Sequence, residues 1–299
     1  MTISSDSIAP LIAVVGSTGL QGGSVINNLA LSDKPYRIRG LTRDAKKNKA
    51  QALAKRDVEV WTVDLSADNA EGIQQSFQGA TYVFIMTNFW EHVDKAREIA
   101  EGKALVEAAH KVGVKLLLVS SEPNATNVTN GKLTKVYHFD SKAESPTMRE
   151  PWVPAGDGSH IVDGTWPEDF RMPLLDTYHD FGLFVQLAIE SDEFNRGDGK
   201  TIWACGDQVT VPDQVKNIST VTGKKIAYNK VTEEQSRAGM VQAGLPPFVV
   251  DDMIEMFKFH EVWNSAYAAG SHVEPAKLAR RPRTFKEYVE NEDWSAVFE

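Results

Sequence analysis

The sequence has little of what secreted, membrane-spanning or disulfide-stabilised proteins need. Its 299 residues include one cysteine, Cys205, so an intramolecular disulfide is excluded. No apolar run approaches the length of a membrane span. The first residues lack the basic and apolar regions of a signal peptide. We therefore expect a cytoplasmic protein that does not contact membranes, with the nucleus as a second compartment.

Runs of lysine and arginine are absent as well. The net charge is −9, and charged residues make up 24% of the chain. Direct nucleic-acid binding is not expected, because it relies on a basic face. Hydrophobic residues make up 42%, which is ordinary for a globular protein with a sizeable core.

The clearest motif lies in Leu11–Gly23. An apolar, β-branched run meets three glycines at a spacing of three, Gly16, Gly19 and Gly22, and the amphipathic segment Ser24–Leu31 follows. This order is typical of a dinucleotide-binding strand, turn and helix. The first glycine permits the turn, the second admits a pyrophosphate, and the third allows close helix packing. The alternative is a purely structural turn. The residues expected at the phosphates are Gly16, Ser17, Thr18, Gly19, Leu20, Gln21 and Gly22.

Apolar strands and helices alternate along the first half of the chain. This alternation predicts a Rossmann-type, doubly wound α/β fold, with a parallel sheet covered by helices on both faces. Ligands bind such sheets beyond the carboxyl ends of the strands. Those ends carry Gly16, Arg43, Asp64, Thr87 and Ser120. Strands are expected at 11–15, 36–42, 58–63, 80–87 and 114–119, helices at 24–31, 45–55, 70–77 and 93–111, and a surface loop at 122–133.

The pattern changes after residue 144. Residues 10–144 are expected to form the nucleotide-binding Rossmann core, and residues 145–299 the C-terminal half. Within that half, residues 174–206 are expected to return to the Rossmann sheet, with a strand at Thr201–Cys205. Residues 207–299 are expected to form a smaller, mostly helical lobe.

The end of the second strand indicates which dinucleotide binds. An NAD site normally has Asp or Glu there, to bond the ribose 2′-hydroxyl, whereas this chain has Thr42-Arg43. Arginine and lysine complement a 2′-phosphate. We therefore expect NADP(H), held by Arg43 with Lys46, Lys47 and Lys49 in the next turns, with a solvated basic helix face as the alternative. Asp44 is expected to cap the next helix. Asp64 is open between an adenine ligand and a turn cap.

Four segments carry a family resemblance: Gly16–Gly23, Leu41–Arg43, Thr87–Glu91 and His138–Lys142. Together they resemble the NmrA-like family, a branch of the atypical short-chain dehydrogenase/reductases, over roughly the first half of the chain. The resemblance implies contacts to NADP(H) from the glycine turn and from Arg43, Lys47, Asp64, Thr87, Asn88, Phe89 and Lys142.

One position departs from the typical reductase of this superfamily. Such enzymes have a tyrosine four residues before the lysine, and its hydroxyl is the general acid; here that position is His138. Tyr137 is adjacent, but a shift of one residue turns a helical side chain by about 100°. Lys142 is thus the candidate catalytic residue, as a ribose ligand or as a base whose pKa the positive cofactor ring lowers. The alternative is a surface lysine.

A second departure follows directly. Lys142-Ala143-Glu144 runs straight into Ser145-Pro146, and the match to the family resumes near Met172. Relative to the family, the rest of one helix and one strand are missing. This loss affects the sixth strand and the nicotinamide pocket.

A complete phosphate end beside a missing tyrosine favours an NADP(H)-binding regulator or redox sensor, and the resemblance implies that it acts through protein partners, which in the family include transcription factors. The alternative is an NADP-dependent oxidoreductase of a small carbonyl, quinone or phenolic compound, in secondary metabolism, that uses Lys142. A third hypothesis is a cofactor site crippled by the missing segment. The sequence leaves open the substrate, the protein partner and the oligomeric state, including a homodimer.

Overall fold

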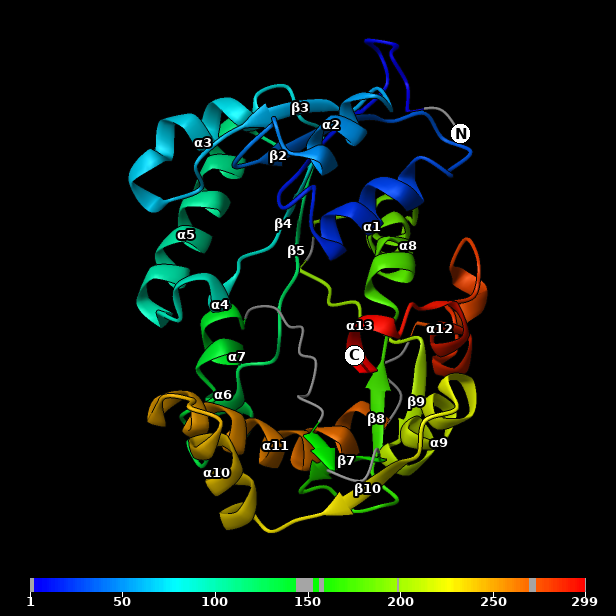
Figure 1. The fold of residues 1–299 in the computed structure, drawn as a ribbon. Helices are drawn as coiled ribbons and strands as arrows, with labels where there is room; N and C mark the ends of the chain where they lie inside the picture. Colours follow the sequence, from blue (N-terminus) through cyan, green and yellow to red (C-terminus); the bar gives the residue numbers. More distant parts are fainter. Residues whose placement is uncertain (1–2, 144–152, 156–158, 198, 269–272, 299) are drawn as a thin grey trace.

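Five strands form the central sheet of the molecule. They are β1 (Leu11–Val14), β2 (Arg37–Thr42), β3 (Glu59–Thr62), β4 (Tyr82–Ile85) and β5 (Leu116–Val119). In the computed structural model, which describes residues 3–143, 153–155, 159–197, 199–268 and 273–298, they lie in the order β3-β2-β1-β4-β5 (Figure 1). Each adjacent pair is parallel, which confirms the predicted Rossmann-type sheet. The point at which the strand order reverses lies between β1 and β4, next to the glycine turn that follows β1.

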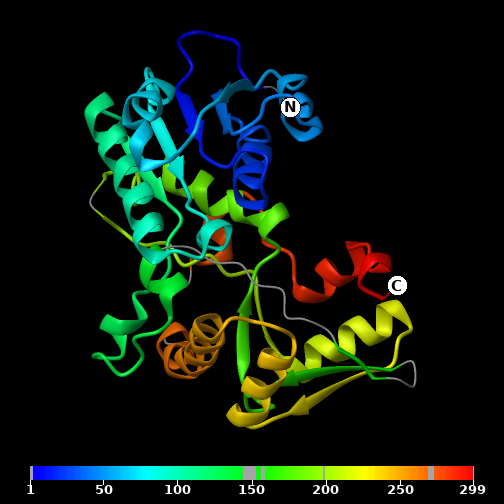
Figure 2. The same ribbon diagram turned by 60° about the vertical axis from the view of Figure 1, so that its left-hand side comes forward.

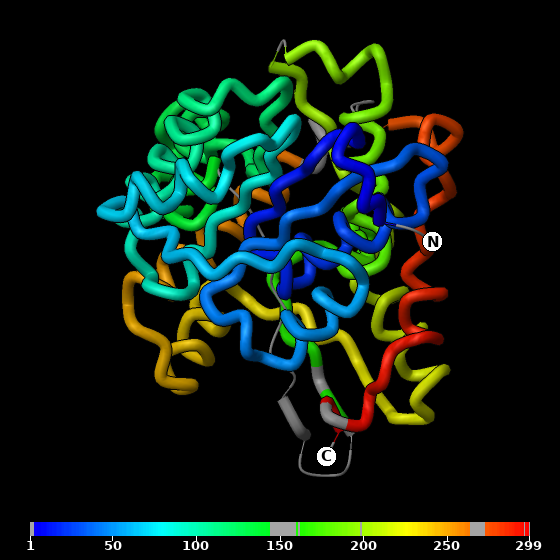
Figure 3. The backbone as a smooth tube through the Cα atoms, turned by 90° about the horizontal axis from the view of Figure 1, so that it is seen from above, coloured from blue at the N-terminus to red at the C-terminus, as the bar shows by residue number. Residues whose placement is uncertain are grey.

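Helices cover both faces of this sheet (Figures 1 and 3). One face carries α1 (Leu20–Leu29) and α8 (Thr177–Glu190), and the other carries α3 (Ala70–Phe77) and α5 (Lys95–Val112). Alternate residues of β1 enter the two cores, because successive side chains of a strand point to opposite faces. Ile12 and Val14 pack with α1 and α8. Leu11 and Ala13 pack with α3 and α5.

Short helices complete the first half of the chain. They are α2 (Asn48–Ala54), the 3-10 turn η1 (Ala67–Asn69), α4 (Phe89–His92), α6 (Ala125–Val128) and α7 (Tyr137–Lys142). Helix α6 lies inside the segment expected to be a loop, so that expectation was wrong for these four residues. The Asn124 side chain caps this helix by accepting a hydrogen bond from the Asn127 backbone N–H at 2.8 Å.

The second half of the chain builds a separate layer at the carboxyl end of the central sheet (Figure 2). Its strands form a three-stranded sheet and an antiparallel pair. Its core joins α7 to three elements of this half, β7 (Ser159–Gly164), α9 (Val211–Thr222) and α11 (Pro247–Ala268). The side chains that meet there include Phe139, Val162, Val215 and Phe259, so helix α7 packs with this second core. The elements are β6 (Val153–Ala155), β7 (Ser159–Gly164), β8 (Arg171–Leu174), β9 (Asp207–Thr210), α9 (Val211–Thr222), β10 (Ile226–Lys230), α10 (Glu233–Gln242), α11 (Pro247–Ala268), η2 (Pro275–Lys277), α12 (Phe285–Asn291) and α13 (Ser295–Phe298).

The segment 174–206 returns to the Rossmann core through a helix. Helix α8 packs so closely on α1 that a Cβ on Gly182 would lie 2.2 Å from the Ser24 carbonyl oxygen. The strand expected at Thr201–Cys205 is reduced to a single bridge at Trp203, and β8 pairs instead with β9. Among the described residues no strand pairs with the outer edge of β5. The junction at 144–152, where the missing element was inferred, lies outside the described residues, and the division of the chain at residue 144 stays a prediction.

Charged side chains fasten the C-terminal segment to α8. The Asp180 carboxylate is fully buried and accepts hydrogen bonds from Arg280 Nη1 at 2.5 Å and from the Arg283 backbone N–H at 2.7 Å. Arg283 also pairs with Asp176 at 3.0 Å. Asp176, His179 and Asp180 lie close enough to hold a metal ion. The arginines already neutralise these carboxylates, so we read the cluster as a structural tether.

None of the helices in the described ranges combines the length and apolar character that crossing a bilayer requires.

Candidate functional site

The glycine turn joins β1 to α1 as predicted. Gly16 has φ +67°, a left-handed conformation that strongly favours glycine. A Cβ on Gly22 would lie 2.4 Å from the Gly16 carbonyl oxygen, so α1 starts this close to the turn because no side chain intervenes. Gly19 is the N-cap residue of α1 and no side chain caps the helix. The first backbone N–H groups of α1 therefore remain available to an anion.

Most other residues of the turn either fasten it to the sheet or are at least partly exposed. The Ser17 hydroxyl donates to the Leu41 carbonyl oxygen at 2.9 Å and fastens the turn to β2. Leu20 is exposed, and Thr18 is partly exposed. Gln21 is buried, and its Oε1 has no hydrogen-bond partner among the described residues. A ligand bound against this turn would contact the partly exposed Thr18 and the exposed Leu20.

Arg43 lies at the carboxyl end of β2, as the sequence predicts. Its side chain is 70% exposed, and its guanidinium forms an ion pair with the Glu91 carboxylate of α4. Lys47 is the exposed N-cap residue of α2. Asp44 Oδ1 accepts a hydrogen bond from the Lys46 backbone N–H at 2.8 Å, which turns the chain ahead of α2. Asp44 therefore does not cap the helix, and that expectation was wrong.

Asp64 follows β3 and is exposed. Its two carboxylate oxygens accept hydrogen bonds from the Ser66 backbone N–H at 3.1 Å and from the Ser66 hydroxyl at 2.9 Å. These bonds stabilise the charged form and hold the pKa of Asp64 below its usual value. The structure thus shows the turn-capping role, and contact with an adenine ring stays a prediction.

The segment after β4 forms a compact corner. Asn88 is exposed and is the N-cap residue of α4. Phe89 is buried, and its ring meets Trp90 edge to face at 5.2 Å between centroids. The Thr87 carbonyl oxygen accepts a hydrogen bond from Lys142 Nζ at 2.8 Å. The predicted Thr-Asn-aromatic segment and the predicted lysine therefore meet.

Lys142 lies inside the protein. Its side chain is 4% exposed, and Nζ lies 3.5 Å from Glu98 Oε1 of α5. The Ser141 hydroxyl donates to the other oxygen of Glu98 at 2.6 Å. The surface-lysine alternative is therefore wrong: Lys142 is held by two partners at the carboxyl end of β4.

His138 lies one turn earlier on α7 and is also buried. Its Nδ1 bonds to Asp252 Oδ1 of α11, and its backbone N–H donates to Asp252 Oδ2 at 3.2 Å. The imidazole centroid lies 5.2 Å from that of Trp90. A carboxylate and an aromatic ring thus fix the orientation of His138.

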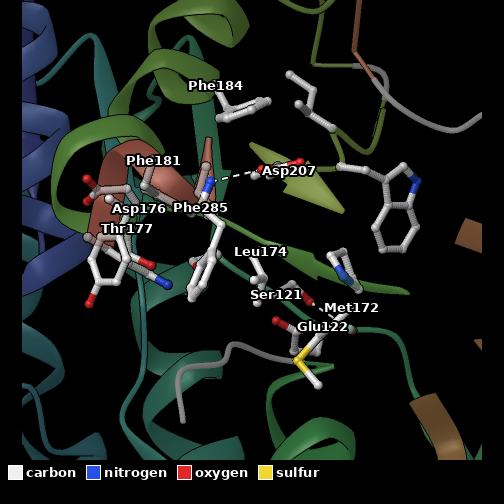
Figure 4. A pocket seen from close by; sticks show the side chains of 18 of the residues that line it. Ser121, Glu122, Met172, Leu174, Asp176, Thr177, Phe181, Phe184, Asp207 and Phe285 are labelled. Carbon is white, nitrogen blue, oxygen red and sulfur yellow. Dashed lines mark hydrogen bonds between the residues drawn. The ribbon is translucent and has the colours of Figure 1, made fainter. Parts of the chain in front are cut away.

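A cavity of about 1310 Å³ opens beside the outer edge of β5. Its walls come from β5, α8, β8, α9, α11 and α12, and most of its lining is apolar. Aromatic side chains from α8 and α12 point into it, while polar groups gather where β5 ends (Figure 4). Residues that form this wall include Ser121, Glu122, Met172, Leu174, Phe181 and Phe285.

Two titratable groups in the cavity wall are shifted toward neutrality. Desolvation raises the pKa of the Glu122 carboxyl to about 8, although Lys142 acts in the opposite direction. Burial lowers the pKa of His260 to about 4, and His138 adds to this effect. At neutral pH the wall therefore presents a protonated carboxyl and an uncharged imidazole.

Three residues of this region were not predicted from the sequence. Glu122 directly follows the fifth strand, and its place at a strand end was the available signal. Glu98 lies in the first turn of the long helix α5, and Asp252 lies 114 positions after His138. Neither carries a local motif, because their partners come from distant parts of the chain.

Comparison with known proteins decides the family. The sequence profile described as the NmrA-like family matches residues 9–150. An NmrA-like family domain-containing protein of Dictyostelium discoideum is 33% identical over 250 residues, 73% of this chain and 79% of that protein. The chain belongs to the NmrA-like family. The NmrA-like family domain-containing oxidoreductase cpsB of Aspergillus campestris is 28% identical over 306 residues, 89% of this chain and 87% of that protein.

Solved structures support the fold of this family member. NmrA, a negative transcriptional regulator in complex with NADP, superposes with a TM-score of 0.66 at 19% identity over 95% of each chain. Triphenylmethane reductase of Citrobacter sp., complexed with NADP(H), superposes with a TM-score of 0.67 at 19% identity over 94% of this chain and 99% of that chain. At these identities the likeness shows the Rossmann-type fold, which regulators and reductases share.

Proposed function

We propose that this NmrA-like protein is an NADP(H)-dependent oxidoreductase that reduces a bulky, largely apolar small molecule held in the cavity beside β5. The observation that carries the proposal is the cavity itself. It lies at the carboxyl end of a parallel sheet, where ligands of this fold class bind. Relatives such as cpsB of Aspergillus campestris are oxidoreductases by name.

The glycine turn fits a dinucleotide. Gly22 lets α1 start directly against the turn, where a Cβ would meet the Gly16 carbonyl oxygen, and α1 begins without a side-chain cap. In the proposal, the turn holds the pyrophosphate, Arg43 and Lys47 hold the 2′-phosphate, and Asp64 lies near the adenine. Thr87, Asn88 and Phe89 border the nicotinamide half. When bound, NADPH supplies a hydride.

Lys142 holds the reacting half in place. Its Nζ is fixed by the Thr87 carbonyl oxygen and lies beside Glu98, so a ribose hydroxyl would meet a donor that is already oriented. Glu122, protonated at neutral pH, presents an O–H donor rather than a charge to the cavity. A carbonyl or quinone oxygen suits such a donor.

The regulator hypothesis does not account for the large cavity beside β5. Sensing a dinucleotide requires the glycine turn and its basic neighbours, but it does not require a large cavity lined by aromatic rings at the nicotinamide end. Fold likeness to NmrA does not separate the two functions, because a reductase superposes equally well. We therefore favour the oxidoreductase, which the sequence placed second.

The test is NADPH consumption by the purified protein with a panel of quinones, enones and aromatic ketones of increasing size. We expect turnover that increases with apolar bulk and is lost in Lys142→Ala. The matched control is Lys103→Ala, an exposed lysine on α5. NADPH binding without turnover on any member of the panel would overturn the proposal in favour of a regulator.

A further inference from the structure

His138 occupies the position at which typical short-chain reductases have the catalytic tyrosine. Its ring is held on one side by the Asp252 carboxylate, and both residues are 1% exposed. Asp252 also accepts the His138 backbone N–H at 3.2 Å. Two bonds from one carboxylate fix both the helix turn and the ring.

The other ring nitrogen has no such partner. Nε2 is buried and makes no hydrogen bond to any of the described residues, although buried polar atoms are normally paired. His138 also lines the cavity beside β5. Because Asp252 accepts the Nδ1–H, Nε2 is a bare acceptor in the neutral ring and an N–H donor in the imidazolium. His138 thus brings a buried, unpaired ring nitrogen to the wall of this cavity.

The surroundings of the ring suit proton transfer. Among the described residues, the titratable groups that act on the ring are Asp252 and His260, both from α11. On the α4 side the ring meets Phe89 and Trp90, at centroid distances of 6.1 and 5.2 Å. Burial keeps His260 neutral at physiological pH, so that residue does not compete as an acid. His138 is the group in this cluster with both an orienting carboxylate and an unpaired nitrogen.

We infer that His138 Nε2 is the proton donor of the reduction, with Asp252 as its positioning residue; this inference rests on the proposed oxidoreductase function. The carbonyl carbon gains a hydride from bound NADPH, and the C=O π electrons move to the oxygen. That oxygen takes the proton from Nε2, which leaves an alcohol, NADP⁺ and a neutral imidazole. Asp252 keeps Nδ1 protonated throughout, so the proton leaves from Nε2, and solvent restores it after product release.

The first test is spectroscopic and uses the wild-type chain. In ¹⁵N-labelled protein, the His138 signals, assigned by their loss in His138→Gln, should show that Nδ1 stays protonated and that Nε2 is the nitrogen that gains and loses the proton as the pH changes. Asp252→Asn should remove that preference for protonation at Nδ1. An Nε2–H tautomer in the wild type would overturn the inference, whatever the activity.

The second test separates proton transfer from structure. His138→Gln should lower kcat about 100-fold or more, the usual contribution of a general acid, while the Kd for NADPH changes less than about twofold. His110→Gln, an exposed histidine of α5, is the control. Equal kcat in His138→Gln and wild type would overturn the inference alone. Absence of turnover in the wild type would overturn the proposed function as well. Should His138→Gln not fold, Asp252→Asn with its pH–rate profile decides: an unchanged profile refutes the inference.

Discussion

The ion pair between Arg43 and Glu91 makes a sharp prediction about cofactor choice. Arg43 is expected to hold the 2′-phosphate of NADPH, yet its guanidinium is already paired with the Glu91 carboxylate. A bound 2′-phosphate must share or displace that carboxylate. Removing Arg43 and removing Glu91 should therefore change NADPH affinity in opposite directions, and neither should change NADH affinity.

The magnitudes follow from exposure. A hydrogen bond to a charged group contributes about 1.5–3 kcal/mol, and the 70% exposed Arg43 belongs at the lower end of that range. Arg43→Ala should thus weaken NADPH about tenfold. An exposed ion pair stabilises by about 1 kcal/mol at most, so Glu91→Gln should tighten NADPH by up to about fivefold. Both effects should shrink in high salt, because exposed charges are screened.

The assay is quenching of the seven tryptophans during titration with NADPH and with NADH. Lys55→Ala, an exposed cation at the far end of α2, is the control and should bind both cofactors as the wild type does. Equal losses for NADPH and NADH in Arg43→Ala would refute the role of the second-strand end. Weaker NADPH binding in Glu91→Gln would refute the competition.

Three further results are expected. Gly22→Ala places a Cβ 2.4 Å from the Gly16 carbonyl oxygen. The free energy of unfolding in urea should therefore fall by about 1–3 kcal/mol, and NADPH should bind more weakly. An unchanged free energy of unfolding would contradict the close approach of α1 to the turn. Arg280→Ala leaves the buried Asp180 carboxylate short of a partner and should cost about 1–3 kcal/mol by the same method, an effect absent if the tether is not structural. The pKa of Glu122 is about 8, above its usual 4.5, so the folded state holds the extra proton and stability falls as pH rises toward 8, by up to about 1.4 kcal/mol per pH unit. The pKa of His260 is lowered from 6.5 to about 4, so this residue makes stability rise with pH below pH 6.5. Glu122→Gln should therefore make Tm nearly independent of pH between about pH 6.5 and 8. A Tm that still falls over this range in Glu122→Gln would exclude Glu122 as the cause.

The first half of the fold could be predicted from the sequence because the patterns that indicate it are local. Apolar runs, glycine spacing and helical periodicity each depend on neighbours within a few residues, and strands β1 to β5 formed where they were expected. The glycine turn and Arg43 could be placed for the same reason, since a strand end fixes where its next residue lies.

The second half depends on contacts that a local pattern does not carry. Thr201–Cys205 has the β-branched and aromatic character of a strand, but β8 pairs with β9, and the segment forms a single bridge at Trp203 in place of a strand. Asp252 reaches His138 only because α11 packs against α7. The burial of Lys142 likewise required the positions of Glu98 and Thr87, which come from two other elements.

The position of the cavity beside the edge of β5 has a consequence for how the substrate range of such a protein can change. The glycine turn, Arg43 and Lys47, which are expected to hold the phosphates of the dinucleotide, lie before residue 50, whereas most of the cavity wall is built from residue 116 onward. Binding of the dinucleotide phosphates and binding of the acceptor molecule therefore depend on separate stretches of the chain. Exchanging the later stretch between relatives should yield chimaeras that keep their redox partner and acquire a different range of acceptor molecules.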